Sequence, residues 1–449
     1  MSAKLTVCGG AGEVTGANFL LETGSVKMVF DCGLHQREQV CSPVNYAPFA
    51  YDVSTIDFLV ISHAHADHIG RVPRFVHEGF KGTILSTNAT KDLTALMLDD
   101  ALNLMENDPK CEPLYERKDV ERAMSLWKGV EYHENVQVGD AVMVLQDAGH
   151  ILGSAMARVT RNGKTFLYTG DLGNTPEPLL RDTESPEGAH FIVMESVYGD
   201  RLHEARSERQ QNLLTHIEAT RARNGVLLIP SFSLERTQVI LSEINALVES
   251  GDMEPIPVFL DAPLSIRATE VYRKYKHMLN DDMQARFAKG DDPFMFEGLK
   301  VTPRALDSQA IHQQPNPKVI IAGAGMSHGG RIREHEKNYL GSTTTTVLFV
   351  GYQSAGSLGR RLQEGASTIS IDGETYTVRA HMETLSGYSG HADRDQLLSF
   401  VEKAHETHPK VFVSLGETKS ASFLAQRITD FLGLEAIVPT TNQSFEIEW

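Results

Sequence analysis

Four side chains that can bind a metal ion lie within six positions of one segment: His63, His65, Asp67 and His68. The segment follows the apolar run 56–61, which predicts a short buried strand. If the strand continues into the loop, His63 and His65 lie on the same side of the backbone, and the next turn brings the other two beside them. A lone histidine would be interpreted as structural, but imidazoles and a carboxylate at this spacing favour zinc. One loop is therefore predicted to supply ligands to two metal centres.

Further polar residues follow predicted strands later in the chain: His150, Asp171 and Glu195, with His391 in a turn rich in glycine and serine. Taken alone, Asp171 could be a turn residue, and His150 could be a loop histidine with ordinary hydrogen bonds. Glu195 and His391 could likewise be structural, although a carboxylate that follows a buried strand needs a partner or a role at a metal. The support for these residues lies in their order along the chain.

These segments, taken in order, resemble the motifs of the metallo-β-lactamase fold. The HxHxDH pattern after a strand looks like the metal-binding motif of that fold, and segments 149–155 and 169–171 look like its third zinc histidine and bridging aspartate. Segments 195–201 and 389–393 narrow the resemblance to the β-CASP nucleases, which include ribonuclease J and the endonuclease that cleaves pre-mRNA 3′ ends. The resemblance spans nearly the whole chain and is closest to the stand-alone bacterial and archaeal members that process RNA.

The resemblance implies a site for two zinc ions. The implied ligands are His63, His65 and His150 for one zinc, Asp67 and His68 for the second, and Asp171 as the bridge. Two zinc ions about 3.5 to 4 Å apart can hold a hydroxide and neutralise the charge that develops on a phosphate oxygen. The expected function is a zinc-dependent ribonuclease that hydrolyses RNA phosphodiester bonds by attack of metal-bound hydroxide, in RNA processing or decay.

The resemblance also implies three catalytic residues: Asp67, Glu195 and His391. Asp67 is expected to contact the hydroxide as well as a metal. Glu195 and His391 match a pair that assists departure of the leaving oxygen, and a histidine oriented by a carboxylate suits a general acid. The sequence leaves open whether cleavage is internal or from the 5′ end.

One position departs from the family pattern. Segment 410–417 matches the last motif of the family, but Leu415 stands where a histidine that completes the second zinc site is expected. The second site is therefore expected to be weakened. One alternative is an RNA-binding partner subunit with a degraded metal site. A second alternative is a metallo-β-lactamase-fold hydrolase of esters or thioesters, although small substrates do not need the inserted domain described next.

The pattern of apolar runs predicts two domains. Short β-rich runs with glycine turns fill the start of the chain, whereas helices alternate with buried strands after residue 201, which indicates a mainly parallel α/β sheet. The resemblance implies a metallo-β-lactamase αββα sandwich interrupted by an inserted α/β β-CASP domain. The expected boundaries are 1–200 for the first part, 201–365 for the insert and 366–449 for the return to the first domain.

Phosphate recognition is expected to be local, because the chain has a net charge of −17 and nucleic-acid surfaces are normally basic. Within 318–361, six Lys or Arg side chains face two acids, and a glycine-rich turn ends in an arginine that could hold phosphate. The alternative is a helix-entry turn with a solvated basic face. The expected substrate-binding residues are Ser231, Arg236, Gly325, Ser327, Gly329, Gly330, Arg331 and Ser389. Asp261 is expected to cap a helix, and His328 and His335 to lie on the surface.

Composition points to a globular protein. The 449 residues are 41% hydrophobic, no run of eighteen apolar residues occurs, and the start resembles a strand rather than a signal peptide, which predicts a cytoplasmic protein with no membrane partner. The four cysteines are sparse and predict reduced thiols. Single-stranded RNA is the expected partner, and a homodimer is left open.

Overall fold

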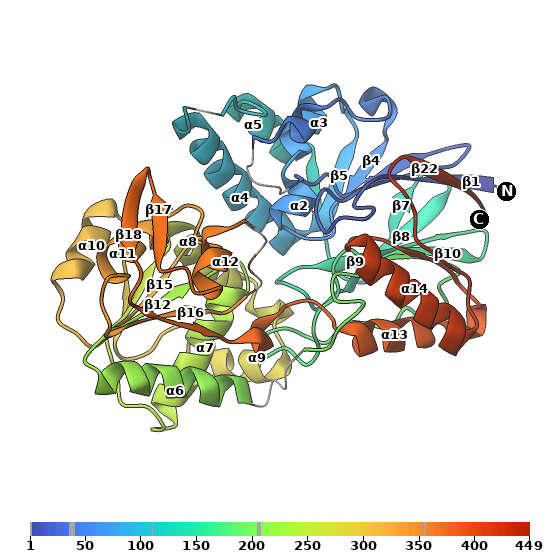
Figure 1. The fold of residues 1–449 in the computed structure, drawn as a ribbon. Helices are drawn as coiled ribbons and strands as arrows, with labels where there is room; N and C mark the ends of the chain where they lie inside the picture. The colour runs from blue at the N-terminus through green and yellow to red at the C-terminus, as the bar shows by residue number, and fades with distance from the viewer. Residues whose placement is uncertain (1, 36–40, 110, 204–207, 352, 354–355) are drawn as a thin grey trace. The chain divides into compact units, whose positions relative to one another are not determined.

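The computed structural model describes residues 2–35, 41–109, 111–203, 208–351, 353 and 356–449. The chain divides into two compact units (Figure 1). The first unit contains Met1–Leu202 and His391–Trp449, and the second contains His203–Gly390. Among the described residues, no helix combines the length and the apolar character needed to cross a bilayer.

The first unit is built on two sheets, each with seven strands among the described residues. In spatial order, the strands of one sheet are β22 (Gln443–Glu448), β1 (Ser2–Gly9), β2 (Asn18–Glu22), β3 (Lys27–Phe30), β4 (Phe58–Val60), β5 (Thr83–Thr87) and β6 (Trp127–Val130). Those of the other are β21 (Ala436–Ile437), β20 (Lys410–Val413), β11 (Phe191–Met194), β10 (Lys164–Tyr168), β9 (Ala155–Arg161), β8 (Ala141–Asp147) and β7 (Val136–Val138). The two sheets bury a shared apolar core that includes Phe19, Phe30, Phe166 and Tyr168.

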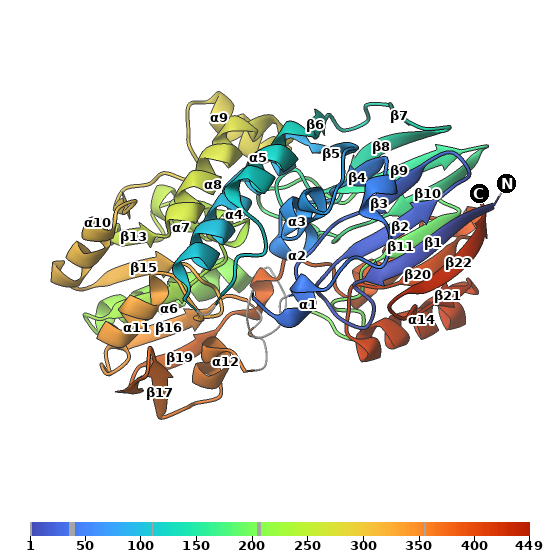
Figure 2. The same cartoon turned by 90° about the horizontal axis from the view of Figure 1, so that it is seen from above.

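Helices cover the outer face of each sheet (Figures 1 and 2). On the first sheet these are α1 (Pro43–Tyr46), α2 (Ala66–Ile69), α3 (Val72–His77), α4 (Asn88–Asn107) and α5 (Arg117–Ser125), with the 3₁₀ turn η1 (Val53–Thr55). On the second sheet these are α13 (Arg394–Glu402) and α14 (Thr418–Leu432), with η6 (His405–Thr407). Phe75 and Leu98 pack against the first sheet, and Leu397 and Leu424 against the second. The expected αββα sandwich is therefore confirmed.

The second unit has a parallel sheet, as expected. Its strands, in spatial order, are β14 (Leu299–Val301), β13 (Val258–Asp261), β15 (Lys318–Ala322), β12 (Val226–Pro230), β16 (Thr345–Phe349) and β19 (His381–Thr384). Its helices are α6 (Arg209–Ala222), α7 (Arg236–Glu249), α8 (Pro263–Lys274), α9 (Asp281–Ala288), α10 (Ala305–Ala310), α11 (Ile332–Tyr339) and α12 (Leu358–Gln363), with the 3₁₀ turns η3 (Lys276–Met278), η4 (Ile311–Gln313) and η5 (Ser386–Tyr388). Helices lie on both faces of this sheet (Figures 1 and 2).

In the structure, the chain returns from the second unit to the first at a later residue than the sequence predicts. The expected boundary was residue 366, whereas residues 366–390 group with the second unit. The hairpin of β17 (Thr368–Ile371) and β18 (Glu374–Thr377) buries Ile369 and Ile371 in the core of that unit, and β19 pairs with β16. These strands are short and largely polar, so their pairing depends on contacts that no local pattern reveals.

One cysteine expectation is wrong. The structure joins Cys41 and Cys111 in a disulfide with a Cα–Cα distance of 5.5 Å, although the sequence predicts four reduced thiols. Cys8 and Cys32 are free, and burial raises the pKa of both thiols to about 12. The two paired cysteines are 70 positions apart, so only the fold brings them together.

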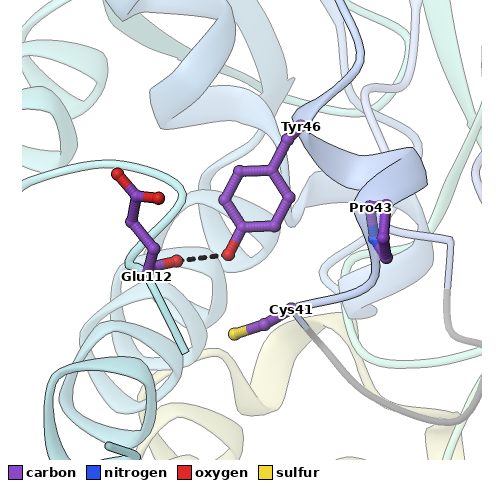
Figure 3. Close-up of a pocket in the computed structure, with 4 residues that line it drawn as sticks. All are labelled: Cys41, Pro43, Tyr46 and Glu112. Carbon is purple, nitrogen blue, oxygen red and sulfur yellow. Dashed lines mark hydrogen bonds between the residues drawn. The ribbon is translucent and has the colours of Figure 1, made fainter. Parts of the chain in front are cut away.

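A hollow lies beside this disulfide and is lined by Cys41, Pro43, Tyr46 and Glu112 (Figure 3). The phenol of Tyr46 donates a hydrogen bond to the backbone carbonyl of Glu112 across it. None of the residues expected to bind metal or substrate is among the four that line this hollow.

A buried carboxylate holds together the carboxyl edge of the sheet in the second unit. Asp261, the last residue of β13, is fully buried and accepts hydrogen bonds from Thr302 Oγ1 (2.7 Å), Ser308 Oγ (2.6 Å), Arg331 Nη1 (2.7 Å) and His335 Nε2 (2.7 Å). His335 is therefore buried rather than on the surface, and Asp261 is an internal anchor rather than a helix cap. Although burial alone would raise the pKa of the Asp261 carboxyl, these donors, His335 foremost, lower it from 3.8 to about 2.

We expect Asp261→Asn to destabilise the second unit by about 3 kcal/mol, because it removes one partner of a buried charged network. The folded carboxyl has the lower pKa, so its stabilisation is present above about pH 4 and is lost as the pH falls towards 2. Hydrogen exchange of peptides from β13 and α11 should show a difference from wild type that shrinks in acid. Asp282→Asn, an exposed change in the same unit, is the control. Equal exchange in the Asp261 variant and the wild type at pH 7 would contradict this assignment.

Candidate functional site

The first unit places each predicted metal residue just beyond a strand end. His63 and His65 lie between β4 and α2, and α2 carries the next two ligands of the motif. His150 follows β8, and Asp171 follows β10. Residues in loops between packed strands are constrained by the core of the unit, as a preorganised site requires.

Four potential ligand atoms converge on one point. His65 Nδ1 lies 3.0 Å from His63 Nε2 and 3.2 Å from His150 Nε2. Asp171 Oδ2 lies 3.5 Å from His63 Nε2 and 3.6 Å from His150 Nε2. A tetrahedral zinc with bonds of about 2.0 to 2.1 Å requires edges of about 3.4 Å between its ligand atoms. The four side chains therefore fit a metal ion of this kind.

His63 is held in its neutral form, as a metal ligand must be. The side chain is fully buried, and burial together with the neighbouring His68 holds its pKa well below the ordinary value. A neutral imidazole keeps the lone pair that a metal ligand must offer. His63 Nδ1 lies 3.0 Å from the hydroxyl oxygen of Ser62, which leaves Nε2 directed at the cluster.

The expected second set of ligands shares Asp171 with the first. His68 Nε2 lies 3.4 Å from Asp171 Oδ1, is buried, and makes no hydrogen bond among the described residues. Asp67 lies in the first turn of α2, and burial raises the pKa of its carboxyl. Leu415 is fully buried in the apolar core between the sheets and supplies no ligand, as the sequence indicates.

Asp31 is a residue of this site that the sequence analysis did not identify. It follows β3 and accepts hydrogen bonds from the backbone nitrogen (2.8 Å) and hydroxyl (2.7 Å) of Ser62, from Tyr168 Oη (2.7 Å) and from His68 Nδ1 (2.7 Å). Ligand histidines are commonly oriented by a carboxylate on their other nitrogen, which Asp31 provides for His68. An acid directly after a buried strand is the signal that could have revealed it.

The segment after Asp31 packs directly on the metal loop. The backbone nitrogen of Cys32 donates to the carbonyl of His68 at 2.7 Å, and that of Leu34 donates to Ala66 at 2.9 Å. A Cβ at Gly33 would lie 1.4 Å from the carbonyl oxygen of Asp67, so only glycine fits there. The loop that carries the ligands is therefore held from behind by backbone contacts.

Glu195 and His391 form a pair beside the cluster. Glu195 is fully buried; its Oε1 accepts from the backbone nitrogen of Leu172 at 2.6 Å and from His391 Nδ1 at 3.2 Å. Burial by itself would lower the pKa of His391. The nearby carboxylates, Glu195 foremost, together have the larger, opposite effect, so the pKa of His391 is raised from 6.5 to about 9. The His391 ring lies 4.6 Å from that of His150, centre to centre. The pair has the geometry of a carboxylate that orients a protonated imidazole.

The expected substrate residues of the second unit differ in their surroundings. Ser231 is buried, with its Oγ 3.0 Å from Thr237 Oγ1, and Ser389 is also buried. Arg236 lies 5.8 Å above the ring of Tyr388. These surroundings leave the expected roles of these side chains as predictions.

The glycine-rich turn connects β15 to α11 and contains the remaining candidates: Gly325, Ser327, Gly329, Gly330 and Arg331. Ser327 has a left-handed φ of 59°, and its side chain, including the hydroxyl oxygen, is buried. Besides Asp261, the Arg331 guanidinium donates to the carbonyls of Thr302 and Pro303. The geometry thus gives Arg331 an internal anchoring role, and contact with substrate stays a prediction.

Two facing sheets with helices outside, and a His/Asp cluster on their connecting loops, define a metallo-β-lactamase-fold hydrolase. Comparison with protein families supports this class over three segments. Residues 11–206 match the metallo-beta-lactamase superfamily, residues 237–362 the Beta-Casp domain, and residues 375–439 the Zn-dependent metallo-hydrolase RNA specificity domain.

Several characterised proteins are similar over most of their length. Ribonuclease TTHA0252 of Thermus thermophilus is 36% identical, covering 92% of this chain and 93% of its own. Transcription termination factor FttA of Methanosarcina mazei is 29% identical over 96% of this chain and 70% of its own, and that of Pyrococcus horikoshii is 30% identical over 97% and 70%. A solved protein of unknown function from Enterococcus faecalis V583 has a TM-score of 0.60 at 11% identity, with all of both chains covered, and supports the fold alone.

The chain belongs to the β-CASP family of metallo-β-lactamase-fold ribonucleases. It is an RNA-processing hydrolase with a metal site, and the resemblance seen in the sequence is confirmed.

We expect Asp31→Asn to weaken metal binding about 10- to 100-fold, because an amide cannot accept all four of the hydrogen bonds that fix His68 and the metal loop. Competition with a calibrated chelator measures the affinity directly. Asp57→Asn, an exposed change near the same sheet, should leave it unchanged. If Asp31→Asn retains wild-type affinity, Asp31 does not orient a ligand.

Proposed function

We propose that this protein is a zinc-dependent ribonuclease that hydrolyses phosphodiester bonds of single-stranded RNA and leaves 5′-phosphate and 3′-hydroxyl ends. The observation that carries the proposal is the convergence of three imidazole nitrogens and a carboxylate beside a buried Glu–His pair. The printed names of the relatives, a ribonuclease and transcription termination factors, support RNA as the substrate.

The residues that would hold the zinc are those of the cluster and of the neighbouring set: His63, His65, His150 and Asp171, then Asp67 and His68. When bound, zinc supplies Lewis acidity that lowers the pKa of water and offsets charge on a phosphate oxygen. His68 is oriented by Asp31, and the burial of the cluster keeps its side chains in place. The protein therefore provides the donor set and its orientation.

Proton transfer is assigned to two groups of the chain. We assign Asp67 as the acceptor of a proton from the attacking water, because its carboxyl lies in the turn that carries the ligands. His391, held by Glu195, donates a proton to the 3′ oxygen as the bond between phosphorus and that oxygen breaks. Water thus adds to phosphorus, and the departing ribose leaves as a neutral alcohol.

One observation supports a second candidate function. Leu415 stands where the family resemblance predicts a histidine ligand, and a protein with a degraded second metal site would bind RNA as a partner subunit without cleaving it. The intact first cluster and the Glu195–His391 pair favour the enzyme.

We expect Asp67→Ala to lower turnover of labelled RNA on the order of a hundredfold or more, because it removes both a ligand and a proton acceptor. EDTA should abolish wild-type cleavage, and added Zn²⁺ or Mn²⁺ should restore it. Asp57→Ala is the control for an exposed aspartate in the same unit. Cleavage by Asp67→Ala close to the wild-type rate would sink the assignment.

Metal content tests whether Leu415, in place of a histidine, weakens the second metal site. A site with three protein ligands still binds zinc, but more weakly, so slow dialysis should remove about one zinc early and activity with it. Leu415→His should tighten the labile ion, as measured by metal analysis during dialysis. Two equally tight metals in the wild-type protein would show that the second site is complete without residue 415. One metal and no RNA cleavage, even with added zinc, would favour the partner-subunit function.

A further inference from the structure

Phe232 is an aromatic side chain at the surface of the second unit. It lies two residues beyond the end of β12, at the carboxyl edge of the parallel sheet, and 38% of it is exposed. In open α/β sheets, ligands bind at this edge. Most other phenylalanines of the unit are in its core, including Phe259, Phe294 and Phe349. An exposed phenyl ring at a ligand-binding edge calls for an explanation other than packing.

The ring rests on two glycines. A Cβ at Gly325 would lie 2.6 Å from Cδ2 of Phe232, and a Cβ at Gly351 would lie 3.3 Å from Cε2. Neither glycine has a left-handed φ, so the backbone conformation does not itself demand glycine at these positions. Their lack of side chains gives the ring a seat on bare backbone.

Side-chain hydrogen bonds make this seat rigid. The buried Gln353 donates from Nε2 to the carbonyl oxygens of both Gly325 (2.9 Å) and Gly351 (3.2 Å), which ties the two glycine segments together. From the first turn of α7, Thr237 Oγ1 donates to the backbone carbonyl of Phe232 at 2.7 Å. The position of the ring is therefore set before any ligand arrives, which lowers the entropic cost of stacking on it.

We propose that the exposed part of Phe232 is a stacking platform for a nucleobase of the RNA substrate. The proposal rests on the proposed ribonuclease function and adds a substrate-positioning site to it. Every base has an aromatic face, so stacking holds RNA without reading its sequence. It also suits this chain, because a protein with a net charge of −17 gains less from phosphate attraction than a basic one and needs contacts that salt does not screen.

Binding of single-stranded RNA oligonucleotides to full-length protein tests the proposal. Phe232→Leu should weaken binding about tenfold and leave the slope of affinity against salt concentration unchanged, because no charge is lost. Phe232→Trp should retain affinity, and RNA should quench its fluorescence. Gly325→Ala, which pushes the ring from its seat, should reproduce the loss. Leu306→Ala removes another apolar side chain of the unit, 74% exposed, and should change nothing.

Oligonucleotides that lack one base at each position in turn identify the contact itself. With wild-type protein, removal of the base at one particular position should weaken binding about tenfold. With Phe232→Leu, removal of that base should no longer change the affinity. If the variant binds every oligonucleotide as the wild type does, or shows the same sensitivity at every position, the platform is disproved while metal-dependent cleavage still stands. If wild-type protein neither binds nor cleaves RNA, the proposed function fails and this inference fails with it.

Discussion

Three imidazole nitrogens and a carboxylate oxygen direct their lone pairs at one point, and the first unit is arranged around keeping them there. Imidazole nitrogens 3.0 and 3.2 Å apart need a shared proton or a bound cation between them, because their lone pairs otherwise repel. The packed sheets hold these side chains close together, because a residue that follows a buried strand moves only if the core moves. Asp31 and the close approach at Gly33 extend the same support to the back of the metal loop.

The second unit uses polar burial for a different purpose. Asp261 gathers four donors from three segments of the chain, at Thr302, at Ser308 in α10 and at the start of α11, and its charge is satisfied internally. Arg331, which the sequence offered as a phosphate ligand, is one of these donors. A guanidinium that already binds a buried carboxylate and two carbonyls has few donors left for phosphate. The same edge of the sheet presents an aromatic ring at the surface, so contact with RNA need not depend on arginine alone.

Charge explains why such local devices matter here. A chain with a net charge of −17 has little long-range attraction for RNA, and each contact must gain its affinity at short range. A cluster of potential metal ligands, a histidine held by a buried glutamate, and a ring that packs on glycine backbone all act at short range. These features can occur in a protein whose surface is acidic overall, whereas a uniformly basic groove cannot.

The sequence by itself determined the metal motif and the class of fold. His63, His65, Asp67 and His68 lie within six positions, so their spacing alone reveals them. The apolar runs predict a β-rich start and a parallel α/β insert, and the resemblance to a known family adds the two-sheet sandwich. Only the tertiary structure decided which distant groups meet: Asp31 with His68, Cys41 with Cys111, and Arg331 with Asp261. It also decided that His335 is buried and that residues 366–390 belong to the second unit. Local patterns report the period of a helix or strand, whereas these contacts depend on how elements far apart in the chain pack together.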